Sequence, residues 1–546
     1  MNPKRLLCAT LMWAPCLVFI TLPAGAYSPL FVMEELDASI SPMESLPGGE
    51  PQPESPSLIQ VGELVFETHE SAHPYSGAGV VWEREFHWLD AGYISLHFSD
   101  FDLLPGDYLE ITDPDRRYVY RYSGKGKVVR GGEEVLSEFW AVHIPGDRAI
   151  ARLVADGMGE GWGIRIDRWA HGYAPEVIDD LLGIGQEEDT RAICGQNDME
   201  WAMCYEGTEI YQRSRAVARL LIQGTSGCTG WLLGSEGHIM TNNHCIGSQG
   251  AADNTDYELM AEGETCDTDC SGWMDCPGIV EATSGTLVRT NGALDYSLIK
   301  LPTDITPTYG YLQLRETLAE VGERIYIPQH PGLGGKRIAV LDDQVGGNCE
   351  VHSTDESPCH GGPGDIGYLC DTDNGSSGSP VIAYSDHLVV ALHHCAYCPN
   401  RGVPIPSIIS DLGNDLPPDA IGFDIVPDIR ANGSDGPITI ASDDTLIVTV
   451  ALDAGNATGE DADWWLAARA SSGRWYFYQY EAGWSTQFSA AYQGRLINLP
   501  TTEVLNMSGL VPDTYVFYFG VDLTMNGSLD PDRLYRDQVE VQVNAN

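Results

Sequence analysis

The cysteines divide this chain into three parts. Of its 14 cysteines, Cys8 and Cys16 lie near the N-terminus and the other 12 lie between Cys194 and Cys398. In an exported chain, an even set of cysteines predicts a framework of disulfides. A length of 546 residues exceeds what one hydrophobic core usually holds. We therefore expect a cross-linked central domain between two flanking domains that contain no cysteine.

The first 26 residues indicate export. Lys4 and Arg5 precede the apolar run 6–22, and the small residues at 24–26 form a cleavage signal, so residues 1–26 read as a secretory signal peptide. The alternative is an uncleaved anchor, but a proline interrupts a run that is already marginal for a membrane span. We expect a secreted, extracellular protein with no membrane contact after signal cleavage.

The flanks predict β-structure. Residues 27–57 are rich in Pro, Ser and Glu and predict a disordered linker. Short alternating runs such as LIQVGELVFE and YISLHFSD fill residues 58–172 and predict a β-sandwich. Their pattern resembles the CUB-like modules of secreted proteins. Residues 173–193 form an acidic connector, and alternating runs in 431–546 predict a second, immunoglobulin-like β-sandwich.

Aromatic residues are concentrated in the C-terminal domain, as in Trp464, Trp465 and the run 475–478. In strands such residues favour core positions, and the alternative is an exposed face that binds a polysaccharide or another surface. The run 522–532 gathers several Asp and Asn side chains, but their spacing departs from the EF-hand pattern, so calcium binding is not favoured.

The charge restricts the partners. The chain has 79 acidic and 30 basic residues and a net charge of -49. Such a surface repels phosphate, so no nucleic-acid partner is expected. We interpret the charge as a determinant of solubility.

One segment with three serines suggests a nucleophile. Residues 375–380 read GSSGSP, and the serine at position 379 departs from the G-x-S-x-G motif of α/β-hydrolases. Gly375 and Gly378 flank Ser377, which allows a tight turn that directs two backbone N–H groups at one oxygen atom. An ordinary Gly/Ser turn is the alternative.

A base and a carboxylate lie at suitable places in the same domain. A serine hydroxyl needs a base within hydrogen-bond reach, and that base needs an acceptor to fix its tautomer. His244 follows the apolar run in IMTNNHC, and Asp295 precedes an apparent strand in LDYSLIKL. Either residue alone could be structural, but the order His244, Asp295, Ser377 favours a catalytic set.

These three blocks resemble those of the trypsin-like, or chymotrypsin-fold, serine endopeptidases. CGQNDMEWAMC, IPQHPGLGGKRI and LHH make the secreted bacterial lysyl and glutamyl endopeptidases the most similar branch. The resemblance covers residues 194–428 and implies an all-β protease domain of two six-stranded barrels. A metallohydrolase is a further alternative, but the HExxH motif does not occur within residues 194–428, which disfavours it.

The resemblance also implies the role of each residue. Ser377 attacks the scissile carbonyl, His244 transfers the proton and Asp295 orients the imidazole. The N–H groups of Gly375 and Ser377 form the oxyanion hole, and Ser376 and Ser379 are turn residues. No cofactor is expected, and the partners are protein or peptide substrates.

Several disulfides are implied by the same resemblance. Cys228 pairs with Cys245, Cys194 reaches Cys395 or Cys398, and Cys204 reaches Cys266, Cys270 or Cys276. Cys349, Cys359 and Cys370 are left unassigned. A zinc site of His393, His394, Cys395 and Cys398 is the rival interpretation, but paired cysteines in an exported chain disfavour it, and no metal is expected.

Three residues bear on substrate choice. Asp371 precedes Ser377 by six positions, where trypsin-like enzymes select Lys or Arg, whereas Thr372 and His393 fall where glutamyl endopeptidases hold an acidic side chain. Direct attraction by an anion slightly favours basic residues at P1, the position before the scissile bond. No residue of CPNRGVPIP matches the aspartate of lysyl endopeptidases, so strict lysine specificity is not supported.

Two alternatives stay open. Residues 27–193 are a candidate pro-region of a zymogen, cut near Glu187 to Arg191, although Ser376 replaces the aspartate that receives the new N-terminus in trypsin. The other alternative is a catalytically idle homologue that acts as an extracellular binding module.

Overall fold

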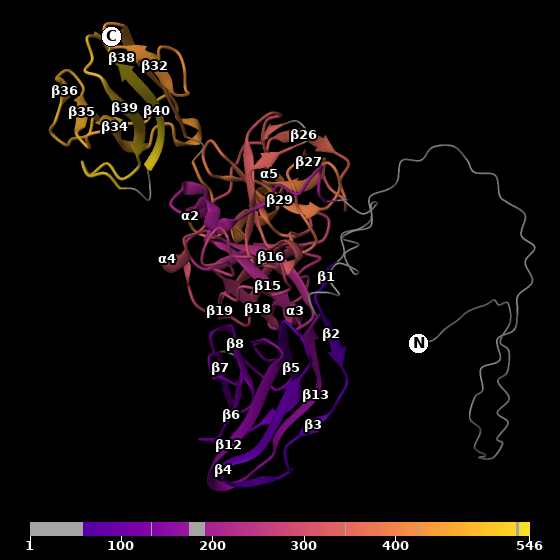
Figure 1. Ribbon diagram of the computed structural model, residues 1–546. Coiled ribbons are helices and arrows are strands. Elements are labelled where there is room, and N and C mark those ends of the chain that lie inside the picture. The colour runs from indigo at the N-terminus through magenta and orange to yellow at the C-terminus, as the bar shows by residue number, and fades with distance from the viewer. Residues whose placement is uncertain are drawn as a thin grey trace, which may run out of the picture. The chain divides into compact units, whose positions relative to one another are not determined.

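A computed structural model describes residues 58–132, 134–173, 192–343, 346–423, 425–530 and 534–545. The predicted signal peptide, the linker, nearly all of the acidic connector and the cleavage region from Glu187 to Arg191 lie outside these residues. Strands dominate the described chain, as predicted, and its helices are short (Figure 1). None of the described helices has the length and apolar character to cross a bilayer.

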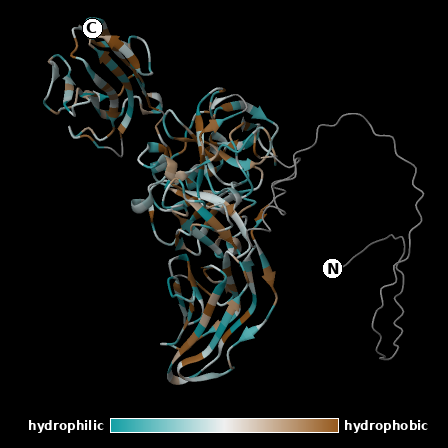
Figure 2. Cartoon of the chain, viewed as in Figure 1, coloured by the Kyte–Doolittle hydropathy of each residue, from teal (hydrophilic) through white to brown (hydrophobic). Residues whose placement is uncertain are grey.

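The N-terminal domain consists of two antiparallel sheets and a hairpin. One sheet contains β2 (Gly62–Val65), β3 (His69–Glu70), β5 (Tyr93–Asp102), β10 (Phe139–Trp140), β11 (Ile144–Pro145) and β13 (Gly163–Gly172). The other contains β4 (Tyr75–His87), β6 (Tyr108–Thr112), β7 (Val119–Ser123) and β12 (Arg148–Gly161), and the hairpin pairs β8 (Lys127–Val129) with β9 (Glu134–Leu136). Buried residues alternate with more exposed ones along the first part of β12, so that Ala149, Ala151 and Leu153 all point into the core. Figure 2 shows hydrophobic and hydrophilic segments mixed along the strands of this domain.

The central domain is built on two larger sheets. The first contains β1 (Ile59–Gln60), β15 (Val217–Ile222), β16 (Ser226–Leu233), β17 (His238–Thr241), β18 (Thr255–Leu259), β19 (Ile279–Ala282), β20 (Thr286–Asn291) and β21 (Tyr296–Lys300). The second contains β14 (Glu200–Trp201), β22 (Ile325–Gln329), β23 (Arg337–Ala339), β26 (Val351–Glu356), β27 (Asp365–Tyr368), β28 (Pro380–Ala383), β29 (Val389–Cys395) and β30 (Asn400–Pro404). A hairpin pairs β24 (Leu341–Asp342) with β25 (Gly347–Asn348), and the helices are α2 (Glu209–Ser214), α3 (Gln249–Ala252), α4 (Thr306–Tyr309) and α5 (Ile405–Leu412).

Each of these two sheets has eight strands rather than the six that the resemblance implied. Short segments account for part of the difference. β1 comes from the predicted N-terminal domain and pairs with Ser226 and Gly227, and β14 adds to β23. The alternation of β1 predicted a strand correctly but could not show which sheet it joins.

The C-terminal domain again has two sheets. β31 (Val426–Ala431), β33 (Thr445–Asp453) and β38 (Leu499–Ser508) form one. The other contains β32 (Ile438–Ala441), β34 (Asp461–Ala470), β35 (Trp475–Gln479), β36 (Gly483–Ser485), β37 (Tyr492–Arg495), β39 (Asp513–Asp522) and β40 (Leu534–Asn544). The domain begins at Val426, before the predicted boundary at 431, because β31 pairs with β33. Trp464 and Trp465 are buried, as predicted for core residues, whereas Trp475 is exposed.

The N-terminal domain makes buried polar contacts with the central domain. Lys127 is fully buried, and its Nζ donates to the carbonyl oxygen of Asp253 at 2.9 Å. The backbone N–H and Nδ1 of His143 both contact Asp256 Oδ2, at 3.0 and 2.8 Å. The hydroxyl of Tyr93 donates to Gly224. An apolar cluster joins the same two domains and contains Ile59, Val61, Tyr93, Leu221, Trp273, Met274 and Leu333.

These contacts predict that cleavage of the connector does not release the N-terminal domain. Separation would expose the apolar cluster to water and break the buried contacts of Lys127 and His143, which is costly. After a cut between 174 and 191, we expect both fragments to elute together in native gel filtration and to separate only in denaturant. Elution of a free domain of residues 58–173 would contradict this expectation and support a removable pro-region.

Candidate active site

Strand pairing brings His244 and Asp295 together. His244 lies in the turn that follows β17, and Asp295 immediately precedes β21. These two strands pair so that Thr241 lies opposite Ser297, which places the turn after one strand beside the start of the other. Asp295 has a φ of 43°, in the left-handed region that turn residues adopt.

The Asp295 carboxylate holds His244 by two contacts. Its Oδ2 lies 2.7 Å from His244 Nδ1, and its Oδ1 accepts the backbone N–H of His244 at 2.9 Å. Asp295 is 1% exposed. Although burial by itself raises the pKa of this carboxyl group, the nearby His244 and His394 hold it well below its usual range. Asp295 is therefore a carboxylate that fixes the ring of His244 with Nε2 as the free nitrogen.

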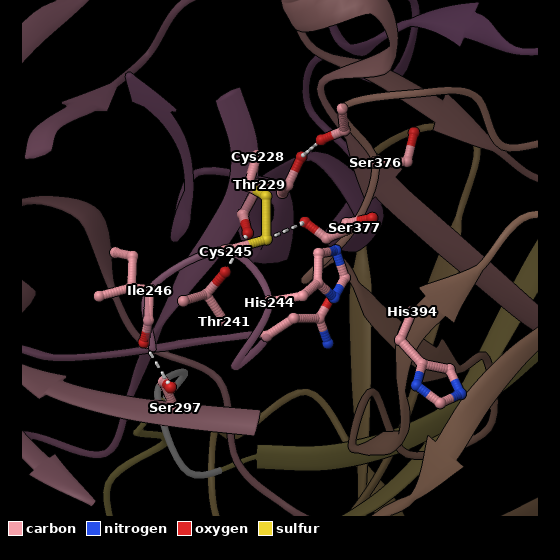
Figure 3. Close-up of a disulfide and its surroundings, with 12 residues drawn as sticks. Cys228, Thr229, Thr241, His244, Cys245, Ile246, Ser297, Ser376, Ser377 and His394 are labelled. Atoms are coloured by element: carbon pink, nitrogen blue, oxygen red, sulfur yellow. Dashed lines mark hydrogen bonds between the residues drawn. A yellow bond between two sulfur atoms is a disulfide. The ribbon is translucent and has the colours of Figure 1, made fainter. Parts of the chain in front are cut away.

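Ser377 is fixed beside the same histidine through its backbone. Its carbonyl oxygen accepts the N–H of Thr229 at 2.9 Å and lies 3.9 Å from the sulfur of Cys245. Figure 3 shows the Cys228–Cys245 disulfide next to Ser377, and the imidazole of His244 lies close to Ser377 as well. Nε2 of His244 is buried and has no hydrogen-bond partner among the described residues.

The turn around Ser377 requires glycine at two positions. Gly375 has a φ of 90° and Gly378 a φ of 89°, which L-residues rarely adopt. A Cβ on Gly378 would lie 2.2 Å from the Thr229 carbonyl oxygen, and one on Gly375 would lie 2.8 Å from that of His330. In the described chain, the N–H groups of Gly375 and Ser377 donate to no protein acceptor. Both are thus available to an oxyanion.

The neighbouring serines stabilise the turn. The Oγ of Ser376 accepts the N–H of Asp373 at 3.1 Å, and the hydroxyl of Ser379 donates to the Ser376 carbonyl oxygen at 2.5 Å. Their hydroxyls are therefore engaged with the backbone, in agreement with the turn role expected for them.

Six disulfides cross-link the central domain. The bridge of Cys228 with Cys245 is confirmed, and Cys194 pairs with Cys398 and Cys204 with Cys266, each within the predicted choices. The remaining pairs are Cys270–Cys276, Cys349–Cys370 and Cys359–Cys395. The rival zinc set is wrong, because Cys395 and Cys398 are both bonded to other cysteines.

Asp371 holds the start of the domain. Its two carboxylate oxygens accept the backbone N–H groups of Cys194 and Asp198, at 2.7 and 2.9 Å. The carboxyl groups of Asp371 and Asp198 lie close together. Burial is the main reason that the pKa of both is raised, and the charge of Asp371 adds to it in Asp198, whose pKa reaches about 7.

The other two predicted substrate-binding residues are buried. Thr372 Oγ1 has no hydrogen-bond partner among the described residues. Nδ1 of His393 contacts the hydroxyl of Tyr368 at 2.7 Å. Burial, together with the charges of His394 and His244, lowers the pKa of His393 to about 3, so its ring is neutral.

Sequence reasoning missed two residues next to the triad. Asp365 and His360 both lie near His394, which the sequence had suggested only as part of the rival zinc set. Nε2 of His394 lies 3.0 Å from Asp365 Oδ2, and its Nδ1 lies 3.4 Å from Asp295 Oδ2. Although burial lowers the pKa of His394, these two carboxylates raise it to about 9. The available signal was that His360 and His394 each adjoin a cysteine.

Two β-sheets that bring a histidine, a buried carboxylate and a serine in a glycine turn into one site define the class of trypsin-like peptidases. The family model of the trypsin-like peptidase domain matches residues 228–392. The chain is also similar to Secreted RxLR effector protein 73 of Plasmopara viticola, with 38% identity over 329 residues that cover 59% of this chain and 79% of that protein. The chain belongs to the family that includes this protein.

Two solved structures share lower similarity. A Glu endopeptidase in complex with MPD is 18% identical, covers 41% of this chain and 98% of its own, and has a TM-score of 0.27. Rv3671c from M. tuberculosis is 13% identical, covers 40% and 94%, and has a TM-score of 0.27. The bacterial lysyl and glutamyl branch is not established by these similarities.

Proposed function

We propose that this protein is a serine endopeptidase that hydrolyses peptide bonds in proteins through Ser377, His244 and Asp295. The observation that carries the proposal is the 2.7 Å contact between Asp295 and His244 Nδ1, which leaves Nε2 buried and unpartnered on the side of Ser377. Such an imidazole can accept the proton of a serine hydroxyl.

Each residue then has one task. Ser377 Oγ attacks the carbonyl carbon while His244 takes its proton, which gives a tetrahedral intermediate. The free N–H groups of Gly375 and Ser377 stabilise its oxyanion, and His244 returns the proton to the leaving amine. A water molecule repeats the sequence on the acyl-enzyme. Asp295 stabilises the imidazolium that forms in both halves.

We place this activity outside the cell. Six disulfides persist in an oxidising compartment, and the relative from Plasmopara viticola is named as a secreted protein. The alternative is an idle homologue that acts as a binding module. A binding module does not need two free oxyanion donors beside a base without a hydrogen-bond partner, so this alternative is less favoured.

We further propose a preference for basic over acidic residues at P1. Two adjacent carboxyl groups, Asp371 and Asp198, attract a cation once they have lost their protons, and the raised pKa of both moves that loss to higher pH. His393 is neutral, with a pKa lowered to about 3, so it offers no positive charge to an acidic side chain. An acidic P1 side chain would therefore meet repulsion without a compensating cation.

A peptide library with Lys, Arg, Glu or Leu at P1 tests activity and specificity together. We expect kcat/KM for Lys and Arg to exceed that for Glu by at least about tenfold, which corresponds to about 1.4 kcal/mol. The ratio of Lys to Leu cleavage should rise with pH through about 7, because Asp198 loses its proton there. Taking the ratio cancels the titration of the shared catalytic machinery.

Asp371→Asn should reduce the Lys-to-Leu ratio, since it removes a charge from this pair. Asp275→Asn is the control, because Asp275 also accepts a backbone N–H, that of Gly272 at 3.1 Å, and lies outside this pair. Preferential cleavage after Glu, or an equal loss of the ratio in both variants, would overturn the proposed preference.

A further inference from the structure

Three imidazoles surround one oxygen atom of Asp295. His244 Nδ1 lies 2.7 Å from Oδ2, His394 Nδ1 lies 3.4 Å from it and His360 Nδ1 lies 3.6 Å from it. The sequence predicted the first contact only. The catalytic mechanism proposed above uses His244 and leaves His360 without a task.

Two of the three nitrogens lack hydrogen bonds. Nδ1 of His394 and Nδ1 of His360 are buried atoms with no hydrogen-bond partner among the described residues. His394 is 2% exposed, so its orphaned nitrogen is shielded from water as well. Buried polar atoms of this kind usually form a hydrogen bond, and these two lie only at ion-pair distance from Asp295 Oδ2, which calls for an explanation.

The distances from Asp295 Oδ2 to the two imidazole nitrogens fit a tetrahedral metal ion. Zinc bonds to histidine and carboxylate of about 2.0–2.1 Å place neighbouring ligand atoms roughly 3.3–3.4 Å apart. The Asp295–His394 and Asp295–His360 separations of 3.4 and 3.6 Å are close to this edge length. All three ligand atoms lie within 4.8 Å of one another. Two neutral imidazoles and a carboxylate form a ligand set that zinc prefers, and the proton that His394 carries leaves when the ion binds.

The surrounding chain fixes the two histidines. Cys359 and Cys395 form a disulfide, and they are the immediate neighbours of His360 and His394. Asp365 then holds both segments, because its Oδ2 lies 3.0 Å from His394 Nε2 and accepts the N–H of Cys359 at 3.1 Å. A carboxylate on the far nitrogen of a histidine is the usual support of a metal ligand.

We propose that Asp295, His360 and His394 form a binding site for a zinc ion that inhibits the enzyme. The inference rests on the proposed peptidase function. The side chain of His360 is 23% exposed, so the cluster lies close to the protein surface, and a water molecule completes the tetrahedron.

Binding there opposes catalysis in two ways. The ion draws on Oδ2, the same oxygen that accepts from His244 Nδ1, and so weakens the contact that orients the base. It also places positive charge near the imidazolium that forms in the transition state, which raises the energy of that state.

Zinc titration of the full-length enzyme tests the functional part. We expect ZnCl₂ to inhibit peptide hydrolysis reversibly, with full recovery in EDTA. His360→Ala should raise the half-inhibitory zinc concentration at least about tenfold, measured against the zinc-free rate of the same variant. The matched control is His352→Ala, an exposed histidine on β26 outside the cluster, which should retain the wild-type value. Equal inhibition of the two variants, or none of the wild type, would overturn an inhibitory site.

Cobalt binding tests the site without any catalysis. In full-length Ser377→Ala, Co²⁺ should produce the visible absorption of a tetrahedral complex at one equivalent, and ZnCl₂ should displace it. Adding His360→Ala to this variant should abolish the band, whereas adding His352→Ala should not. If the wild-type protein cleaves no peptide but the cobalt band appears, the metal site is supported and the peptidase function is rejected. If the band survives His360→Ala, the metal site is rejected.

Discussion

Replacing Ser377 by alanine is expected to lower kcat by on the order of 10⁶-fold, as removal of the nucleophile does in other serine proteases. The hydroxyl is the atom that forms the acyl-enzyme, and no other serine can replace it. Ser376 is bound to the N–H of Asp373, and Ser379 donates to the Ser376 carbonyl oxygen. The measurement is steady-state hydrolysis of a fluorogenic peptide, with circular dichroism to show that the variant is folded.

Ser376→Ala is the matched control, because it removes a hydroxyl from the adjacent residue of the same turn. Losing one backbone contact should cost stability of about 1 kcal/mol and leave kcat far closer to wild type than Ser377→Ala does. If a folded Ser377→Ala protein cleaved the peptide at the wild-type rate, the assignment of the nucleophile would be wrong.

Asp295→Asn should give the second-largest loss, about 10⁴-fold in kcat, as the same change does in other triads. The amide nitrogen of asparagine cannot accept the Nδ1–H of His244, so the ring is held in the wrong tautomer. The negative charge that stabilises the imidazolium is lost as well. The measurement is kcat on the same peptide as for Ser377→Ala.

Asp365→Asn serves as the comparison for this change. It alters a carboxylate that reaches His394 but not His244, so its effect on kcat should be much smaller. A loss below tenfold in Asp295→Asn, or equal losses in the two variants, would contradict the orienting role of Asp295.

Much of the site could be predicted because its residues carry local signals. The glycines around Ser377 occupy two left-handed backbone positions, and the short sequence GSSGSP is enough to predict such a turn. His244 and Asp295 each adjoin an apolar strand, and the pairing of β17 with β21 then brings them together.

What could not be predicted depends on contacts between distant segments. His360 lies near Asp295 in a segment that the Cys359–Cys395 disulfide helps to hold, and the connectivity of many cysteines is not encoded in their spacing. Asp371 suggested a pocket residue, yet its oxygens also hold the N–H groups of Cys194 and Asp198 across a long stretch of chain. The sequence of β1 predicted the first strand of the N-terminal sandwich, but β1 pairs with β16 of the central domain. Alternation with a period of two predicts a strand but not the sheet that it joins.

The most direct test of the central claim is covalent labelling of the purified full-length protein with a fluorophosphonate, followed by mass spectrometry of its peptides. An activated serine beside a general base should carry one label per chain, on Ser377, and His244→Ala should suppress the reaction. If folded wild-type protein takes up no label, or if the label lies on another residue, the account of this site as a serine peptidase is contradicted.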